Sequence, residues 1–118
     1  MKTRAWDGER FRDDYVVMPD GTLRQLTYNK NYAAVLGGSV DWKLSRFTGL
    51  LDKNGEEIYE GDIIRVEELT SCESGSYWKW FTRIVEYKYQ YFIPEDLDDS
   101  YVIGNIFQNP ELLEEVNK

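Results

Sequence analysis

The chain contains no histidine, and this limits the chemistry that its other side chains can perform. Histidine is the usual base that activates serine and cysteine nucleophiles, and it is a common zinc ligand. The single cysteine, Cys72, therefore has no histidine partner. Gly37 and Gly38 are not followed by Lys-Ser or Lys-Thr, so they do not form a phosphate-binding loop. We predict that the protein is not an enzyme and has no catalytic residue.

Carboxylates are the remaining candidates for a metal site. Asp52, Asn54 and Glu56 alternate as in a calcium loop, but Gly55 comes one residue after Asn54 instead of after a third ligand, so a hairpin turn explains them better. A second acidic group lies in the stretch 94–99 and comprises Glu95, Asp96, Asp98 and Asp99. That group either binds a divalent ion weakly or is a solvated acidic loop. We predict no cofactor and assign no metal ligand.

Aromatic side chains are the best candidates for a binding surface. In the stretch 77–92, which we predict to be one long strand, the tyrosines alternate with polar residues and would share one face. The two tryptophans lie upstream in the opposite register, which predicts a bulge or burial of both faces. Such a face is either sheet core or an interface, where tyrosine is enriched. The candidate protein-interaction surface is Tyr87, Tyr89, Tyr91, Trp78 and Trp80.

Two glycine turns organise the elements that would position these side chains. Asn54 and Gly55 tolerate the positive φ that hairpin turns require, and short apolar segments flank them. Gly61 precedes the apolar stretch 63–66, which predicts a sharp bend or bulge where a new strand begins. The central region of the chain is therefore predicted to fold as turn, strand, bend and strand.

Other local patterns predict further strands, loops and one helix. Proline, aspartate and glycine in 19–22 predict a turn between strands at 15–18 and 23–28, and 29–31 is predicted to be another turn. Further strands are predicted at 40–45 and 101–106. The stretches 32–39 and 67–76 are predicted to be irregular or loop. Asn109 as N-cap and Pro110 at the first helical position predict a short helix to about Val116.

These elements together predict a mainly β fold. We expect a small antiparallel barrel or curled sheet, SH3-like or related, with N-terminal hairpins and one short C-terminal helix. The length of 118 residues suits a single domain over 1–118. No apolar run approaches the about 20 residues of a membrane helix, and residues 1–7 do not resemble a signal peptide. With one unpaired cysteine, we predict a cytoplasmic protein without a membrane partner.

Charge is distributed unequally along the chain. The net charge is −8, with +2 in residues 1–50 and −10 in residues 51–118. An acidic surface repels phosphate backbones, so nucleic-acid binding is disfavoured. The acidic part either keeps the protein soluble or docks on a basic partner protein, which includes the case of imitating nucleic acid.

Three blocks of sequence occur in a recognisable order. The first runs from Thr3 to Asp7, the second from Thr48 to Ile63, and the third from Val102 to Leu113. They resemble the patterns RAWD, TGL-DKNG-EIYEGDI and IGNI…NPELL, in the same order and spacing, of the YopX family of small bacteriophage and prophage proteins. The chain departs at Arg46, where the family commonly has glutamine, and in the region 11–14. The resemblance implies a bacterial host and a YopX-like domain, and it carries no established biochemical activity.

Three functional hypotheses follow. The first is a non-enzymatic accessory protein that binds a host or phage protein through its acidic and aromatic surface. The alternatives are a nucleic-acid-associated module, allowed by the slightly basic residues 1–50, and a metal-dependent hydrolase that uses the Asp/Glu cluster. We also expect a homo-oligomer, because a ribbon with aromatic residues on both faces cannot bury both within one small barrel.

Overall fold

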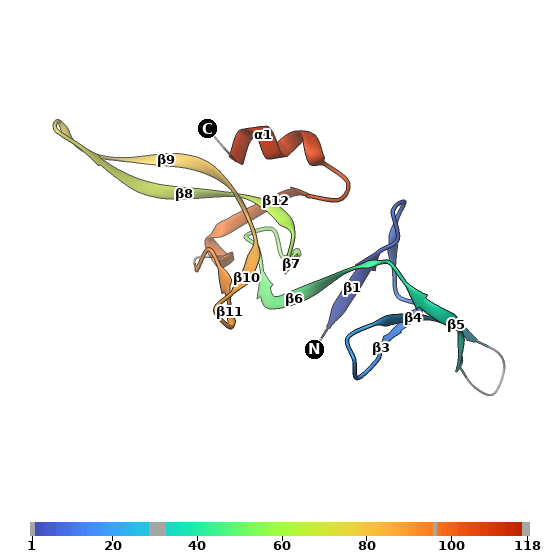
Figure 1. Ribbon diagram of the computed structural model, residues 1–118. Helices are drawn as coiled ribbons and strands as arrows, with labels where there is room; N and C mark the ends of the chain where they lie inside the picture. Colours follow the sequence, from blue (N-terminus) through green and yellow to red (C-terminus); the bar gives the residue numbers. More distant parts are fainter. Residues whose placement is uncertain (1, 29–32, 96, 117–118) are drawn as a thin grey trace. The chain divides into compact units, whose positions relative to one another are not determined.

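A computed structural model describes residues 2–28, 33–95 and 97–116 and shows a protein built mainly of antiparallel strands (Figure 1). The chain forms two compact units. The N-terminal unit is Thr3–Ser45, and the C-terminal unit is Met1–Lys2 with Arg46–Lys118. The mainly β, antiparallel fold with one short C-terminal helix is confirmed. Within the described residues the sheets are open and do not close into a barrel, so the curled-sheet alternative holds.

The N-terminal unit consists of short strands joined by tight turns. The strands are β1 (Thr3–Trp6), β2 (Phe11–Arg12), β3 (Tyr15–Val17), β4 (Leu23–Tyr28) and β5 (Ala33–Val40). β1 and β2 form one hairpin, and β4 lies between β3 and β5. The predicted turn after β3 is confirmed, with Gly21 at a φ of 87°. The predicted turn at 29–31 lies outside the described residues.

β5 corrects two predictions about the middle of the chain. The stretch 32–39 was predicted to be irregular, but residues 33–40 form a strand that pairs with β4. Between the pairs Leu23–Val40 and Gln25–Leu36, β5 uses two residues more than β4, so a bulge accommodates Gly37 at a φ of 54°. The predicted strand 40–45 is interrupted instead, because the chain leaves β5 at Val40 and β6 begins only at Lys43.

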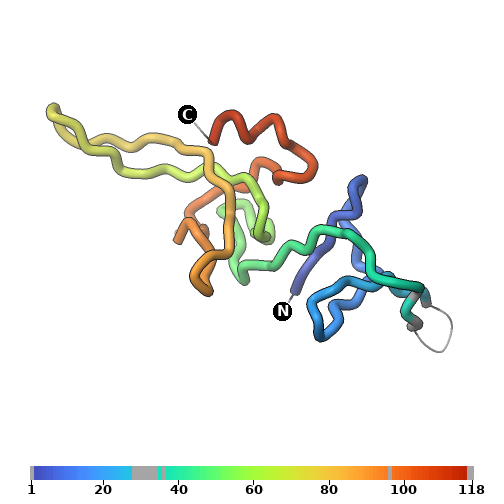
Figure 2. Tube along the Cα trace, in the orientation of Figure 1, coloured from blue at the N-terminus to red at the C-terminus, as the bar shows by residue number. Residues whose placement is uncertain are grey.

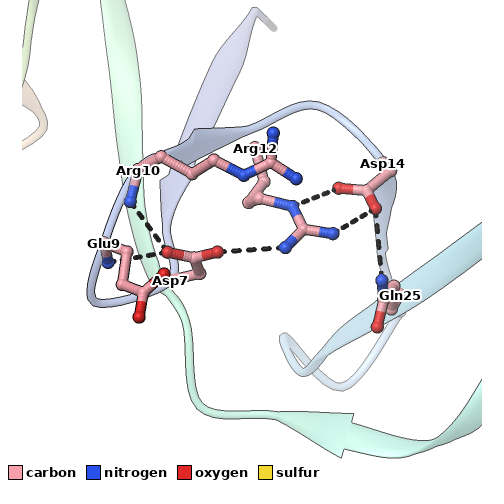
Figure 3. Close-up of polar contacts among 6 residues, drawn as sticks. All are labelled: Asp7, Glu9, Arg10, Arg12, Asp14 and Gln25. Carbon is pink, nitrogen blue, oxygen red and sulfur yellow. Dashed lines mark hydrogen bonds and ion pairs between the residues drawn. The ribbon is translucent and has the colours of Figure 1, made fainter.

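A charged network holds the turns of the N-terminal unit together (Figure 3). The Arg12 guanidinium donates to both carboxylate oxygens of Asp14, from Nε at 2.8 Å and from Nη2 at 2.5 Å. It also donates to Asp7 Oδ2 at 3.0 Å, and Gln25 Nε2 donates to Asp14 at 3.2 Å. These side chains are largely shielded from water, since Arg12 is 16% exposed and Asp7 13%. The network links the β1–β2 turn to β4.

The same contacts shift the pKa values of the acidic partners. The backbone N–H groups of Arg10 and Glu9, and then Arg12, lower the pKa of Asp7 to about 2. Hydrogen bonds from Arg12 hold the pKa of the Asp14 carboxyl well below its usual range, and Gln25 adds to this effect. Both aspartates are therefore charged in the folded protein at neutral pH, where they stabilise the guanidinium between them.

The C-terminal unit contains the remaining elements. The strands are β6 (Lys43–Leu51, which begins in the N-terminal unit), β7 (Glu57–Tyr59), β8 (Asp62–Cys72), β9 (Gly75–Ile84), β10 (Glu86–Lys88), β11 (Tyr91–Ile93) and β12 (Ser100–Asn105). The helices are the 3₁₀ turns η1 (Leu97–Asp99) and η2 (Pro110–Leu112) and the α-helix α1 (Leu113–Val116). Three strands form a sheet in the order β12-β8-β9, and β10 pairs with β11. Figure 2 traces the chain of β8 and β9, which run side by side. None of the described helices has the length and apolar character needed to cross a membrane.

The C-terminal unit has a small apolar core. Ile58, Ile64, Val85 and Leu97 are almost completely buried and pack together, and Phe92 and Val102 cover them. Each fully buried side chain of this size contributes about 1.5–3 kcal/mol. The core therefore joins β7, β8 and β12 to η1 and to the link between β9 and β10.

The predicted hairpin at Asn54 and Gly55 is confirmed, and the buried carboxylate of Asp52 supports it. β6 and β7 pair at Leu51–Glu57, and Gly55 has a φ of 82°. Asp52 Oδ1 accepts hydrogen bonds from the N–H groups of Asn54 at 2.8 Å and Glu56 at 2.9 Å. Its Oδ2 accepts from the N–H of Val102 in β12 at 2.9 Å. Asp52 thus acts as a structural acceptor that attaches the hairpin to the central sheet.

The end of the chain forms the predicted short helix, as η2 followed by α1, but its start differs from the prediction. Asn109 makes no side-chain capping bond to the helix. Its Oδ1 instead accepts from the N–H of Asn105 at 3.2 Å. Gly104 makes this approach feasible, because a Cβ there would lie 2.5 Å from that oxygen. The asparagine is used to fold the chain back on β12 rather than to begin the helix.

Candidate protein-binding surface

β8 and β9 form a long two-stranded arm, which corrects the predicted loop at 67–76. The strands pair continuously from Ile63–Ile84 to Cys72–Gly75, and the turn is formed by Glu73 and Ser74 (Figure 1). Residues 71–80 are all exposed. Backbone pairing, rather than burial of side chains, makes this polar sequence a strand. The signal that could have indicated it is Ser74-Gly75 between the strand-favouring residues Thr70 and Tyr77.

One face of the arm carries large apolar side chains. Leu69 pairs across the strands with Trp78, and they are 58% and 63% exposed. Trp80 is 42% exposed, and its ring centroid lies 6.0 Å from that of Tyr101 on β12. Large exposed apolar side chains that are contiguous on a surface usually indicate an interaction site. Leu69, Trp78, Trp80 and Tyr101 are called the arm face below.

The opposite face of the arm is aromatic and basic. Phe81 is half-buried, with the Lys79 ammonium 5.3 Å and the Arg83 guanidinium 4.6 Å from its ring centroid. Arg83 also forms an ion pair with Glu68 at 3.4 Å. Both faces of the ribbon therefore carry aromatic groups, as the sequence predicted.

The three candidate tyrosines do not share a strand face, so that prediction is wrong. The stretch 77–92 breaks at the buried Val85 and reverses direction at Tyr89 and Gln90. Tyr87 is half-buried and lies opposite Phe92 across the β10–β11 hairpin, with the two ring centroids 4.9 Å apart. Tyr89 is 84% exposed at the hairpin tip. Trp78 and Trp80 therefore lie on the arm, whereas Tyr87, Tyr89 and Tyr91 lie in the β10–β11 hairpin.

The turn of the β10–β11 hairpin has a strained backbone. Tyr89 and Gln90 have φ values of 54° and 71°, which residues with a Cβ adopt at a cost of about 1–2 kcal/mol each. We expect Gln90→Asn to raise the free energy of unfolding by about 0.5 kcal/mol, because asparagine tolerates this conformation. Urea titration measures the change. Lys88→Asn, at an ordinary strand position, is the control and should give no gain; an equal gain from both would contradict the explanation.

Cys72 and the carboxylates form no site in the part of the chain that the structure describes. Cys72 is exposed near the arm tip, where a hydrogen bond with Ser74 at 3.2 Å lowers the pKa of its thiol. Among the described residues no group of three His, Cys, Asp or Glu side chains could hold a metal ion. Of the acidic stretch 94–99, Asp98 and Asp99 are exposed, and Asp96 lies outside the described residues.

Comparison with known proteins agrees with the fold. The sequence model of the YopX protein family matches residues 2–114. The crystal structure of protein EF1440 from Enterococcus faecalis is 26% identical, with a TM-score of 0.59 over 95% of this chain and 96% of that one. YopX from Bacillus subtilis is 20% identical, with a TM-score of 0.59 over 93% and 95% of the two chains. Among curated proteins no sequence matches. The chain belongs to the YopX family.

Proposed function

We propose that this protein is a non-enzymatic accessory protein of a phage or prophage that binds another protein in the cytoplasm of the bacterial host. The observation that carries the proposal is the arm face, where Trp78 exposes 63% of its surface beside Leu69 and Trp80. Tryptophan is the residue most enriched among those that dominate binding energy at interfaces. The absence of histidine from the chain supports a binding role over catalysis that depends on histidine.

We expect the double variant Trp78→Ser/Trp80→Ser to weaken binding to the partner at least about 30-fold, because one buried interface tryptophan contributes about 2 kcal/mol or more. The protein is immobilised, proteins retained from host lysate at two salt concentrations are identified, and binding is remeasured with the purified partner. Leu51→Ser removes an apolar side chain that is 51% exposed elsewhere and serves as the control. Equal binding by the double variant and the wild type would refute a role for the arm face.

We further propose that the protein is a homo-oligomer. Both faces of the arm carry aromatic side chains, and a second copy would shield one of them from water. Copies with a charge of −8 repel one another, so the contact should avoid residues 95–99 and tighten with added salt. Sedimentation velocity at micromolar concentration is expected to show species larger than the 14.0 kDa monomer. A single monomeric species at both low and high salt would show that the proposal is wrong.

A further inference from the structure

β9 has an open edge. The sheet order is β12-β8-β9, so β9 pairs with β8 on one side and has no strand on its other side within the described residues. In a strand with one neighbour, every second residue directs its N–H and C=O groups away from that neighbour. An unpaired row of such groups is a template for another extended chain.

A cavity of about 370 Å³ runs along this edge. Its lining includes the five consecutive residues from Lys79 to Arg83. Successive side chains point to opposite faces of a sheet, so a cavity lined by five consecutive residues follows the strand. Arg65 of β8, which pairs with Thr82, also lines the cavity and reaches it across one face of the sheet. Glu115 of α1 forms part of the wall, and its carboxylate accepts a hydrogen bond from Thr82 at 3.5 Å. The cavity is therefore a groove between an open strand and a short helix.

The groove is positive in an otherwise acidic region. Residues 51–118 contain six Lys and Arg against sixteen Asp and Glu, yet three of the six line this groove with a single carboxylate, that of Glu115. Arg83 is paired with Glu68. Arg65 and Lys79 are exposed and make no ion pair with any described side chain. A guanidinium and an ammonium that have no carboxylate partner among the described side chains, beside an open strand, favour a ligand with carboxylates.

We propose that the β9 edge binds an acidic, extended peptide segment of the partner protein, which adds to the sheet as a fourth strand. Backbone hydrogen bonds to β9 supply the affinity, as in other proteins that bind a peptide by strand addition. Arg65 and Lys79 select carboxylate side chains of the peptide, and Trp80 contacts its apolar ones. This inference rests on the proposed protein-binding function and identifies the chemistry of the bound segment.

Two other occupants fit the groove less well. Symmetric pairing of β9 with β9 of a second copy would bring Lys79 and Arg83 of each copy together, and like charges across strands are destabilising. A nucleic acid strand would be attracted to the cations, but it cannot continue a ladder of backbone hydrogen bonds. The groove also contains Glu115, which would repel phosphates.

The test begins with a displayed library of random peptides of about eight residues, the length of an ordinary strand. We expect the selected peptides to be acidic, with apolar residues at alternate positions. The strongest is synthesised in two N-methylated forms, each methylated at one alternate set of amides. Only one set of peptide amides faces β9, so one form should bind at least about tenfold more weakly and the other should bind like the parent peptide.

Protein variants test the charges. Arg65→Glu and Lys79→Glu are each expected to lower the affinity for the selected peptide at least about tenfold. Lys88→Glu makes the same charge change on β10 and should have no effect. Circular dichroism confirms that each variant is folded, and the N-methylated peptides test the edge on the unmodified protein.

Several results would overturn the inference. The first is a selection that yields basic peptides or no peptide at all. The second is peptide binding that neither pattern of N-methylation weakens. The third is displacement of the peptide by single-stranded DNA at equal concentration. If Trp78→Ser/Trp80→Ser abolishes partner binding while the peptide tests fail, the strand-addition inference falls and the protein-binding function stands. If the peptide tests succeed and Trp78→Ser alone, at a position outside the groove lining, binds the partner normally, the arm face is refuted and the groove stands.

Discussion

Replacing Asp52 with alanine is expected to lower the free energy of unfolding of the C-terminal unit by about 3 kcal/mol or more, because a hydrogen bond to a charged group contributes about 1.5–3 kcal/mol and alanine removes three of them. The carboxylate is 6% exposed. It accepts from the N–H groups of Asn54, Glu56 and Val102, and the last of these belongs to β12. Alanine therefore removes the side-chain support of the hairpin and one of its bonds to β12, while the backbone bond from Lys53 N–H to Ser100 O at 3.0 Å remains.

Two further variants separate these contributions. Asp52→Asn keeps one side-chain oxygen, which still accepts hydrogen bonds from the hairpin. Its N–H₂ group cannot accept from the N–H of Val102, so the free energy of unfolding should fall by an intermediate amount. Glu56→Gln changes the charge of an exposed neighbour and should alter stability little. Urea titration followed by amide NMR signals of β12 measures all three. If alanine were no more destabilising than Glu56→Gln, the hydrogen bonds of Asp52 would not be structural.

Replacing Arg12 with methionine is expected to destabilise the N-terminal unit strongly at neutral pH. The substitution would leave two largely shielded carboxylates, Asp7 and Asp14, without their shared cation. Leaving a charge without its partner in such a place is more costly than losing an exposed ion pair. The guanidinium also lies 4.7 Å from the ring of Trp42, a contact that methionine would make only in part. Arg10→Met removes the same charge from an exposed side chain and is the control.

The pH dependence of stability tests the same network. Because the pKa of Asp7 in the folded protein, about 2, lies below its ordinary value of 3.8, ionised Asp7 stabilises the folded state above about pH 4, and this contribution is lost as pH falls through 2. Asp14 acts in the same direction. In Arg12→Met the stability lost between neutral pH and pH 2 should be smaller, and the carboxyl pKa values should rise. NMR titration of both carboxyl groups measures the shift; unchanged pKa values would contradict the assignment.

Local sequence determined the turns that require an unusual backbone conformation. Gly55 and Gly61 have φ values of 82° and 88°, and the hairpin and the bend lie where their residue types predicted them. Gly21 behaves in the same way. Such positions are predictable because the need for positive φ arises within a few residues and is met mainly by glycine and asparagine. The mainly β fold and family membership follow from the same local motifs.

Turns without such residues escaped prediction. The reversal at Tyr89 and Gln90 contains neither glycine nor asparagine. The sequence pattern therefore predicts that the stretch 77–92 is one strand with a tyrosine face. In the structure the buried Val85 ends β9, and a new hairpin follows. The core stabilises this arrangement enough to offset the strain at the tip, and a local pattern cannot reveal that balance.

Only the tertiary structure decided which residues meet at the candidate sites. The polar stretch 67–76 becomes strand because it pairs with β9, a partner that composition does not identify. Asn109, well suited to cap a helix, instead bonds to Asn105 because Gly104 leaves room for its side chain. Arg65 and Glu115 are far apart in the sequence and line one groove only because α1 folds back beside β9. Turn geometry depends on neighbouring residues, whereas strand pairing and binding grooves depend on contacts between distant ones.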